Sequence, residues 1–182
     1  MKETDLKIRF FGDPALRKKS IPVRNITQRH KDALSQMSKL MYEDSGVGFA
    51  APQAGINEKM IVVDIGSGLY KLVNPAVINR KGSQINQEGC LSIPGICVKV
   101  KRANSISVRA QDEDGKSVKI EAQGLLACVL QHEIDHLRGR LVVDYASIWE
   151  KLRVKKKLEE LSNRSRHENL SEQRNKSCKL QL

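Results

Sequence analysis

The chain has 182 residues, 40% of them hydrophobic, and a formal net charge of +11 at pH 7. Such a length suits one well-buried domain and is too short for two ordinary ones. The apolar runs are too short to cross a bilayer, and the first residues match neither a signal peptide nor a transit peptide. The default expectation is therefore a cytoplasmic protein without a membrane partner.

The first predicted element is a helix that begins after residue 27. Thr27 is the expected N-cap and Gly46 the expected stop, and a glycine-rich loop, "GVGFAAPQAG", follows at residues 46–55. Between these signals, apolar residues recur at helical spacing at Ala33, Leu34, Met37, Leu40 and Met41. The spacing predicts a helix that ends shortly before the loop.

Four strand-like runs and two helices are predicted next. The strands cover residues 59–66, 69–77, 104–111 and 117–123, and "DEDG" at 112–115 predicts a hairpin turn between the last two. Residues 124–139 are apolar nearly all round before His132, as in a helix that crosses a core, and Gly139 is the stop signal. A charged helix is expected from about residue 147 to about 162. This order predicts an α+β fold, with mostly antiparallel sheets around a central buried helix carrying H-E-x-x-H.

The C-terminal part of the chain is strongly basic. Residues 151–182 contain ten Lys or Arg and four Glu, a net charge of +6. We expect a single catalytic domain at residues 1–163 and a polar basic tail at 164–182 that is frayed or disordered. A basic tail indicates an acidic neighbour such as nucleic acid or a ribonucleoprotein surface, and a solvated helix is the alternative. Aromatic residues are only 4% of the chain, which argues against base stacking.

The segment "LQHEIDHLRG" at 130–139 carries the clearest chemical signal. On a helix, His132 and His136 lie one turn apart on the same face, with the Glu133 carboxylate beside them. Two imidazoles and an adjacent acid form a partial metal site with a built-in base. A catalytic site normally needs a third protein ligand. The candidates are Cys90, Cys97, Cys128, Asp135, Asp144 and His167.

Cys90 is the best candidate for the third ligand. It lies in "QEGCLSIPG" at 87–95, where glycine and proline predict an irregular backbone that can approach a helix closely. Cys97 and Cys128 are better explained as core residues, and His167 as part of a solvated tail. No cysteines form a C-x-x-C pair, so buried thiols or metal ligands are favoured over a disulfide framework.

Three segments together resemble the signature motifs of the peptide deformylase family. They are "GVGFAAPQ" at 46–53, "EGCLS" at 88–92 and "QHEIDHL" at 131–137, in the order and at the spacing of that family. The likeness extends over roughly 155 residues from Leu6 onward. It implies a metal-dependent hydrolase that removes the N-formyl group from the N-terminal formylmethionine of newly synthesised polypeptides and releases formate.

The resemblance also implies a role for each matching residue. Glu133 is the implied general acid/base, and the nucleophile is a water activated by the metal. The implied metal ligands are Cys90, His132 and His136, and the implied oxyanion donors are the side-chain amide of Gln53 and the backbone N–H of Leu91. Gly48 is implied to pair with the substrate backbone, and the methionine pocket is implied to be lined by Val47, Leu125, Val129 and His132. The resemblance also implies that the pair Glu88 and Arg102 braces the cysteine loop. For that pair, a plain surface salt bridge is the alternative.

The cofactor and the partners are less closely defined. A thiolate with two imidazoles suits zinc, whereas the resemblance implies Fe²⁺ in the cell, which Zn²⁺, Ni²⁺ or Co²⁺ can replace. The C-terminal helix resembles that of the bacterial type that docks on the ribosome near the exit tunnel. Phe49 stands where the family usually has leucine or isoleucine and is expected beside the cleft. The oligomeric state is left open.

Two rival functions share some of these features. A zinc endopeptidase also uses H-E-x-x-H, but its third ligand is usually a histidine or glutamate downstream of the helix. A non-catalytic zinc protein with an RNA-binding tail would normally have four protein ligands, and Glu133 would then have no role.

Overall fold

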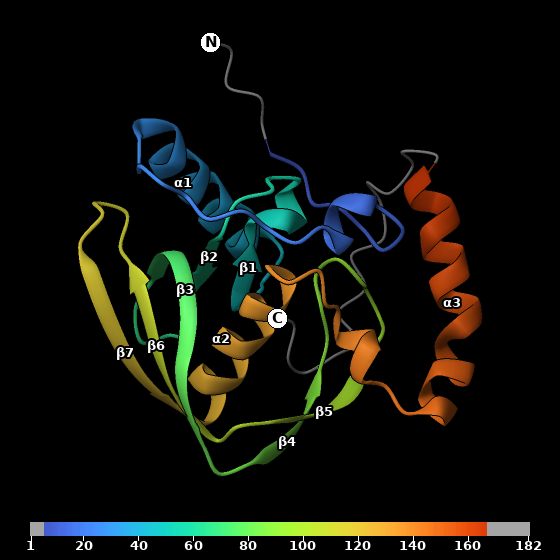
Figure 1. The fold of residues 1–182 in the computed structure, drawn as a ribbon. Helices are drawn as coiled ribbons and strands as arrows, with labels where there is room; N and C mark the ends of the chain where they lie inside the picture. Colours follow the sequence, from blue (N-terminus) through green and yellow to red (C-terminus); the bar gives the residue numbers. More distant parts are fainter. Residues whose placement is uncertain (1–5, 167–182) are drawn as a thin grey trace.

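The computed structural model describes residues 6–166, and side chains as far as residue 163. Within this range the helices and strands follow the order shown in Figure 1. They are α1 (Gln28–Glu43), β1 (Gly48–Ala50), β2 (Met60–Val63), β3 (Tyr70–Lys81), β4 (Gln84–Glu88), β5 (Val98–Arg102), β6 (Ser105–Gln111), β7 (Ser117–Gln123), α2 (Gly124–His136) and α3 (Ile148–Arg166), with short 3₁₀ helices η1 (Pro14–Arg17), η2 (Ala51–Ala54) and η3 (Val142–Tyr145).

The strands form two antiparallel sheets. One has five strands in the order β1-β2-β3-β6-β7, and the other is the two-stranded ribbon β4-β5. Strands β6 and β7 pair in register from Ser105↔Gln123 to Gln111↔Ser117, so the hairpin predicted at residues 112–115 is confirmed. This mixture of antiparallel sheets and helices confirms the predicted α+β class.

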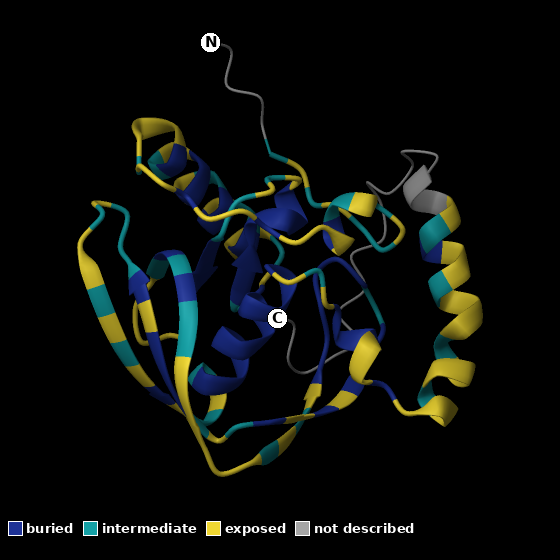
Figure 2. Cartoon of the chain, viewed as in Figure 1, coloured by how far each residue is buried: buried dark blue, intermediate teal, exposed yellow. Residues whose placement is uncertain are grey.

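Helices α1 and α2 cover opposite faces of the sheet edge formed by β1 and β2. Because side chains alternate along a strand, Ile61 and Val63 of β2 join the core cluster of α2, whereas Met60 and Val62 join the cluster of α1. Residues 127–136 of α2 are all buried, and the helix is dark blue over most of its length in Figure 2. This burial explains why its sequence is apolar nearly all round before His132.

The helix boundaries lie close to those expected. α1 has Thr27 at its N-cap and ends at Glu43, before Ser45 adopts a left-handed backbone (φ 55°). α2 ends at His136, and Gly139 follows with φ 70°. α3 reaches Arg166, slightly beyond the expected end. Residues 167–182, the greater part of the expected tail, lie outside the described residues.

One expectation about the sheet is wrong. Phe49 is fully buried and packs in the cluster of α1 with Met37 and Met41, not beside a cleft. Its neighbours Gly48 and Ala50 point to the opposite face of β1, because residues alternate along the strand. None of the helices in the described part of the chain is long and apolar enough to span a bilayer.

Candidate metal and active site

The structure brings Cys90, His132 and His136 together. The two histidines lie one turn apart on α2, and their Nε2 atoms are 3.2 Å apart. Cys90 lies in the loop after β4, and its Sγ is 3.4 Å from Nε2 of His136. All three donor atoms are within 4.8 Å of one another, and all three side chains are buried.

These distances fit a single divalent ion. Nitrogen and sulfur ligands bound at 2.0–2.3 Å in a tetrahedral arrangement stand about 3.3–3.6 Å from one another. The separations of 3.2 Å between the rings and 3.4 Å from Cys90 to His136 are close to those values. Two imidazoles and one thiolate form a donor set suited to zinc or iron, and three protein ligands leave a position open for water or substrate.

Burial controls the protonation of two of these groups. It lowers the pKa of His136 well below the ordinary value, so the ring is neutral and can act as a ligand. Burial, with a further contribution from the Glu133 charge, raises the pKa of Cys90 to about 12. The thiol is therefore protonated at neutral pH unless a bound cation stabilises the thiolate.

Glu133 is a buried carboxylate without a partner. It is fully buried, and neither of its oxygens has a hydrogen-bond partner among the described residues. Burial raises its pKa well above the ordinary value, an effect that the charge of Arg102 opposes. A Cβ atom at Gly48 would stand 2.9 Å from Glu133 Cδ, so the glycine leaves room for the carboxylate. An unpaired buried acid is costly, and such groups concentrate at functional sites.

Gln53 is fixed with its amide nitrogen directed at the cysteine loop. It is fully buried in η2, and its Oε1 accepts a hydrogen bond from the Ala50 N–H at 2.8 Å. Its Nε2 is then 3.6 Å from Cys90 Sγ and 3.2 Å from Ser92 Oγ. Leu91 follows Cys90 directly and is itself buried. Two candidate oxyanion donors therefore flank the thiol.

Two of the four predicted pocket residues, Val47 and Val129, lie beside Gly48. Val129 Cγ1 is 2.9 Å from the position that a Gly48 Cβ would take. Val47 packs against the core cluster that contains Val129. Leu125 lies one turn earlier on α2 and is 41% exposed. Val47 and Val129 are thus close together beside β1, Leu125 is more exposed, and the fourth residue, His132, is buried on α2.

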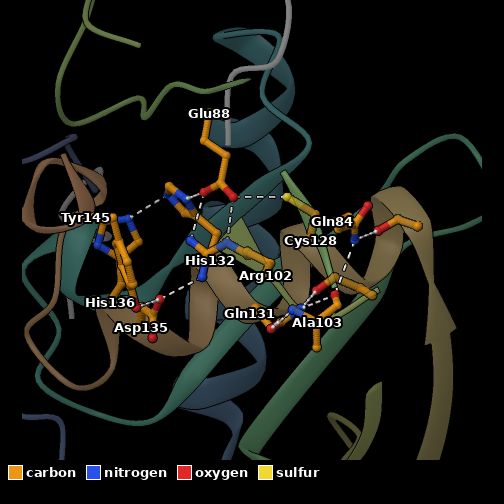
Figure 3. A network of polar contacts seen from close by, with 12 residues as sticks. Gln84, Glu88, Arg102, Ala103, Cys128, Gln131, His132, Asp135, His136 and Tyr145 are labelled. Atoms are coloured by element: carbon orange, nitrogen blue, oxygen red, sulfur yellow. Dashed lines mark hydrogen bonds and ion pairs between the residues drawn. The ribbon is translucent and has the colours of Figure 1, made fainter. Parts of the chain in front are cut away.

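Glu88 and Arg102 form a buried pair behind His132 (Figure 3). Arg102 donates through Nε and Nη2 to both oxygens of Glu88, at 2.6 and 2.7 Å. Oε2 of Glu88 also contacts Nδ1 of His132 at 3.0 Å. Burial alone would raise the pKa of Glu88, but the hydrogen bonds from His132 and Arg102 outweigh it and bring the pKa to about 2. The alternative of a plain surface salt bridge is wrong, because Glu88 is 0% and Arg102 6% exposed.

Comparison with known proteins identifies the family. The sequence profile described as polypeptide deformylase matches residues 5–152, most of the chain. This chain belongs to the peptide deformylase family. It is therefore an enzyme of the class that removes the formyl group from formylated nascent peptides, and the family consists of metalloenzymes.

This chain covers nearly the whole length of its relatives, both those compared by sequence and those compared by structure. The peptide deformylase of Halothermothrix orenii is 48% identical over 141 residues, which are 76% of this chain and 92% of the relative. That of Alkalilimnicola ehrlichii is 40% identical over 165 residues, covering 88% of this chain and 93% of the relative. The crystal structure of the Thermus thermophilus peptide deformylase superposes with a TM-score of 0.83 at 35% identity, covering 87% of this chain and 98% of that one. The Synechococcus elongatus peptide deformylase, solved in complex with actinonin, superposes with a TM-score of 0.80 at 36% identity, covering 86% of this chain and 90% of that one.

Other residues that were candidate ligands have different partners in this deformylase. Cys128 donates its thiol to Glu88 Oε1 at 3.1 Å. Asp135 binds Arg102, and Asp144 binds Arg17. Cys97 is in a disulfide, so the expectation of a free thiol is wrong at that position. His167 lies outside the described residues.

Sequence reasoning missed two polar residues of this peptide deformylase site. Ser92 is fully buried and holds the Gln53 amide, and only its place in the "EGCLS" motif pointed to it. Tyr145 donates to Asp135 Oδ2 at 2.6 Å. No local pattern around Tyr145 indicated that contact.

Proposed function

We propose that Cys90, His132 and His136 hold one divalent metal ion, and that Glu133 transfers the proton during hydrolysis of the formyl amide of N-terminal formylmethionine. The observation that carries this proposal is the convergence of three donor atoms within 4.8 Å, next to a buried carboxylate with no hydrogen-bond partner among the described residues. In this view α2 is the central helix of the catalytic fold, since it supplies both imidazoles and the carboxylate.

The protein side chains have separate tasks in the reaction. When bound, the divalent ion supplies Lewis-acid chemistry, which lowers the pKa of water and polarises the formyl carbonyl. Glu133 takes a proton from the attacking water and delivers it to the leaving amine, so one carboxylate serves both steps. The Gln53 amide and the Leu91 N–H donate to the oxygen on which negative charge develops. In comparable oxyanion sites, one such donor is worth about 2.7–4 kcal/mol of barrier.

The substrate peptide is proposed to lie along β1. This strand is at the edge of the five-stranded sheet and pairs with β2 on one side. Its other edge presents backbone groups to an extended chain, a common mode of peptide recognition, and Gly48 is the proposed pairing position. Val47, Val129 and Leu125 then form the walls that contact the methionine side chain, together with the ring of His132.

The decisive experiment measures formate release from formyl-Met-Ala-Ser by protein purified without oxygen. We expect release from the formyl peptide, little from acetyl-Met-Ala-Ser, and a loss of at least about 100-fold in kcat for Glu133→Gln with metal content unchanged. Bound iron and zinc are quantified in the same samples, and Fe²⁺ is the proposed ion in the cell.

Two outcomes would contradict the proposal. Cleavage of internal peptide bonds without formate release would favour an endopeptidase. Retention of metal and full activity by Glu133→Gln would favour a purely structural site.

The proposed cellular setting is the cytoplasm, with nascent chains at the ribosome as the source of substrate. Helix α3 supports ribosome docking, because Lys151, Arg153 and residues 155–157 are exposed cations. Contacts with phosphates weaken as salt rises.

Deleting residues 164–182 and, separately, replacing Lys155 and Lys156 with glutamine should reduce co-sedimentation with ribosomes at low salt. Profiles identical to that of the full chain would remove this part of the proposal.

A further inference from the structure

Tyr145 is connected to a proposed metal ligand through three other side chains (Figure 3). Its hydroxyl donates to Asp135 Oδ2 at 2.6 Å, and the same oxygen accepts from Arg102 Nη1 at 2.8 Å. Arg102 donates through its other two nitrogens to both oxygens of Glu88, at 2.6 and 2.7 Å. Glu88 Oε2 contacts Nδ1 of His132 at 3.0 Å.

We infer that Tyr145 is a positioning residue for His132. The inference rests on the proposed function, in which His132 is a metal ligand through Nε2. A ligating imidazole needs a partner for its other nitrogen, which fixes both the tautomer and the orientation of the ring. Glu88 is that partner, and Tyr145 acts on it through Asp135 and Arg102.

The guanidinium of Arg102 transmits the constraint because it is planar and held on two edges. Glu88 takes one edge with two hydrogen bonds, and Asp135 takes the remaining Nη1. A planar group held at both edges has a fixed orientation. Arg102 is only 6% exposed, so water has little access to replace a weakened contact. A displacement of Asp135 is therefore passed on to Glu88.

Tyr145 acts on this cluster in two ways. Its ring centroid is 5.2 Å from Cζ of Arg102, a cation–π contact. Its hydroxyl donates to the Asp135 carboxylate, which is only 8% exposed, from a side chain that is itself 37% exposed. Without the hydroxyl, mobile water would take its place on the carboxylate.

The helix η3, which carries Tyr145, packs in a different core cluster from α2. Tyr145 is the last residue of η3, whose Val142 and Val143 are 2% and 5% exposed. These valines pack in the same core cluster as Cys90, together with Ile93. Tyr145 is therefore anchored to the cluster that holds the cysteine loop, and it reaches across to the helix that carries the histidines.

The test compares Tyr145→Phe with Tyr42→Phe. The Tyr42 hydroxyl also donates to a carboxylate, Asp64 Oδ2, at 2.7 Å, but that pair is exposed and has no bond to Glu88, Arg102 or Asp135 among the contacts of the described residues. Each variant is loaded with Co²⁺, and the ion is then removed with an excess of chelator. We expect Tyr145→Phe to release Co²⁺ about three- to tenfold faster and to change the visible absorption of the bound ion. Tyr42→Phe should match the wild type in both. In formate release, Tyr145→Phe should lower kcat and leave KM unchanged.

A double-mutant comparison tests the route. If Tyr145 acts through Asp135, release from Tyr145→Phe/Asp135→Asn should be no faster than release from Asp135→Asn alone. Effects that multiply would overturn the inference, as would a wild-type release rate and spectrum in Tyr145→Phe. A wild-type protein that binds no Co²⁺ would instead contradict the proposed function, so the two failures are distinguishable.

Discussion

At the level of single residues, the absence of a side chain at Gly48 makes room for the Glu133 carboxyl group. A side chain at Gly48 would meet both the Glu133 carboxyl group and Val129 Cγ1, the latter at 2.9 Å. Both neighbours are held in the buried α2, so neither can move away easily. The carboxylate has the space that it occupies only because residue 48 has no Cβ.

Gly48→Ala should therefore damage proton transfer more than metal binding. The new methyl group displaces the carboxylate of Glu133, the proposed general base, and a displaced base loses much of the roughly 100- to 10,000-fold that such a group contributes. We expect kcat for formate release to fall by at least about 30-fold, with metal content unchanged. Both are measured on the same protein preparation.

Gly46→Ala is the matched control for that substitution. A Cβ at Gly46 would meet Cδ1 of Leu91 at 2.7 Å, the far end of a flexible side chain. Leu91 is buried, but its Cδ1 can shift by rotation of the side chain while the backbone N–H keeps its position, so the loss in kcat should be smaller than for Gly48→Ala. Equal losses in the two variants would contradict the special role of Gly48.

The residues of the candidate site differ in how far the sequence reveals them. His132 and His136 are set by the period of one helix, so their proximity follows from spacing alone. Cys90 required the irregular motif around it. The partners of Asp135 and Cys128 were not predictable, because they depend on Arg102 and Glu88, which come from a ribbon distant in sequence.

At the level of elements, the β4-β5 ribbon supplies the buried charges behind α2. Glu88 ends β4 and Arg102 ends β5, and both side chains are buried. A lysine at position 102 keeps one positive charge but lacks the planar fork needed to bind Glu88 and Asp135 together. Loss of a partner from a buried ion pair typically costs about 3–5 kcal/mol.

Arg102→Lys should therefore lower the free energy of unfolding by about 2–4 kcal/mol, measured by urea denaturation. Arg17→Lys is the control. Arg17 binds Asp144 through two hydrogen bonds, at 2.6 and 3.0 Å, but the two side chains are 45% and 38% exposed. An exposed pair contributes about 1 kcal/mol or less. Similar losses in the two variants would show that burial does not strengthen the Arg102 contacts.

The Arg17–Asp144 pair links η1 to η3 and makes the free energy of unfolding depend slightly on pH. Partial burial would raise the pKa of Asp144, but hydrogen bonds from Arg17 and from the Leu141 N–H outweigh it and lower the pKa. A lowered pKa in the folded state means that the stabilisation is complete above the ordinary carboxyl pKa and is lost as the pH falls through the folded value.

Asp144→Asn should therefore be less stable than the wild type at pH 7, by about 1 kcal/mol or less because the pair is exposed. The difference should shrink as the pH falls below the ordinary carboxyl pKa of about 4. Urea denaturation at several pH values measures it. A difference that grows as the pH falls would contradict this account.

The elements differ in how well the sequence predicts them. The helices and the β6-β7 hairpin carry local signals, namely the Thr27 cap and the "DEDG" turn, and both are confirmed. Strands β4 and β1 are short and lack a clear alternation, so they were not predicted. The error at Phe49 has a tertiary cause, because only the packing of α1 on one face of β1 decides where that side chain lies.

For the molecule as a whole, a bound ion would add a further link between parts of the chain that otherwise meet through packing and hydrogen bonds. Cys90 belongs to the core cluster that contains η3 and β5, whereas both histidines lie on α2. An ion held by all three stabilises the folded state by mass action, by about 4 kcal/mol when its concentration is 1,000 times the dissociation constant.

Chelation should therefore lower the melting temperature by several degrees, measured by calorimetry. Cys90→Ala should melt at the same temperature with and without chelator, and a shift as large as that of the wild type would contradict the assignment.

The division of the donors between a loop and a helix also has a kinetic consequence. His132 and His136 share a rigid support, whereas Cys90 lies on an irregular segment that contains Pro94 and Gly95. Brief opening of that segment alone would detach the sulfur while the imidazoles stay aligned. Dissociation of the ion and deuterium uptake by the amides of residues 89–96 would then report the same fluctuation, and the lifetime of the loaded enzyme would be set by this loop rather than by global unfolding.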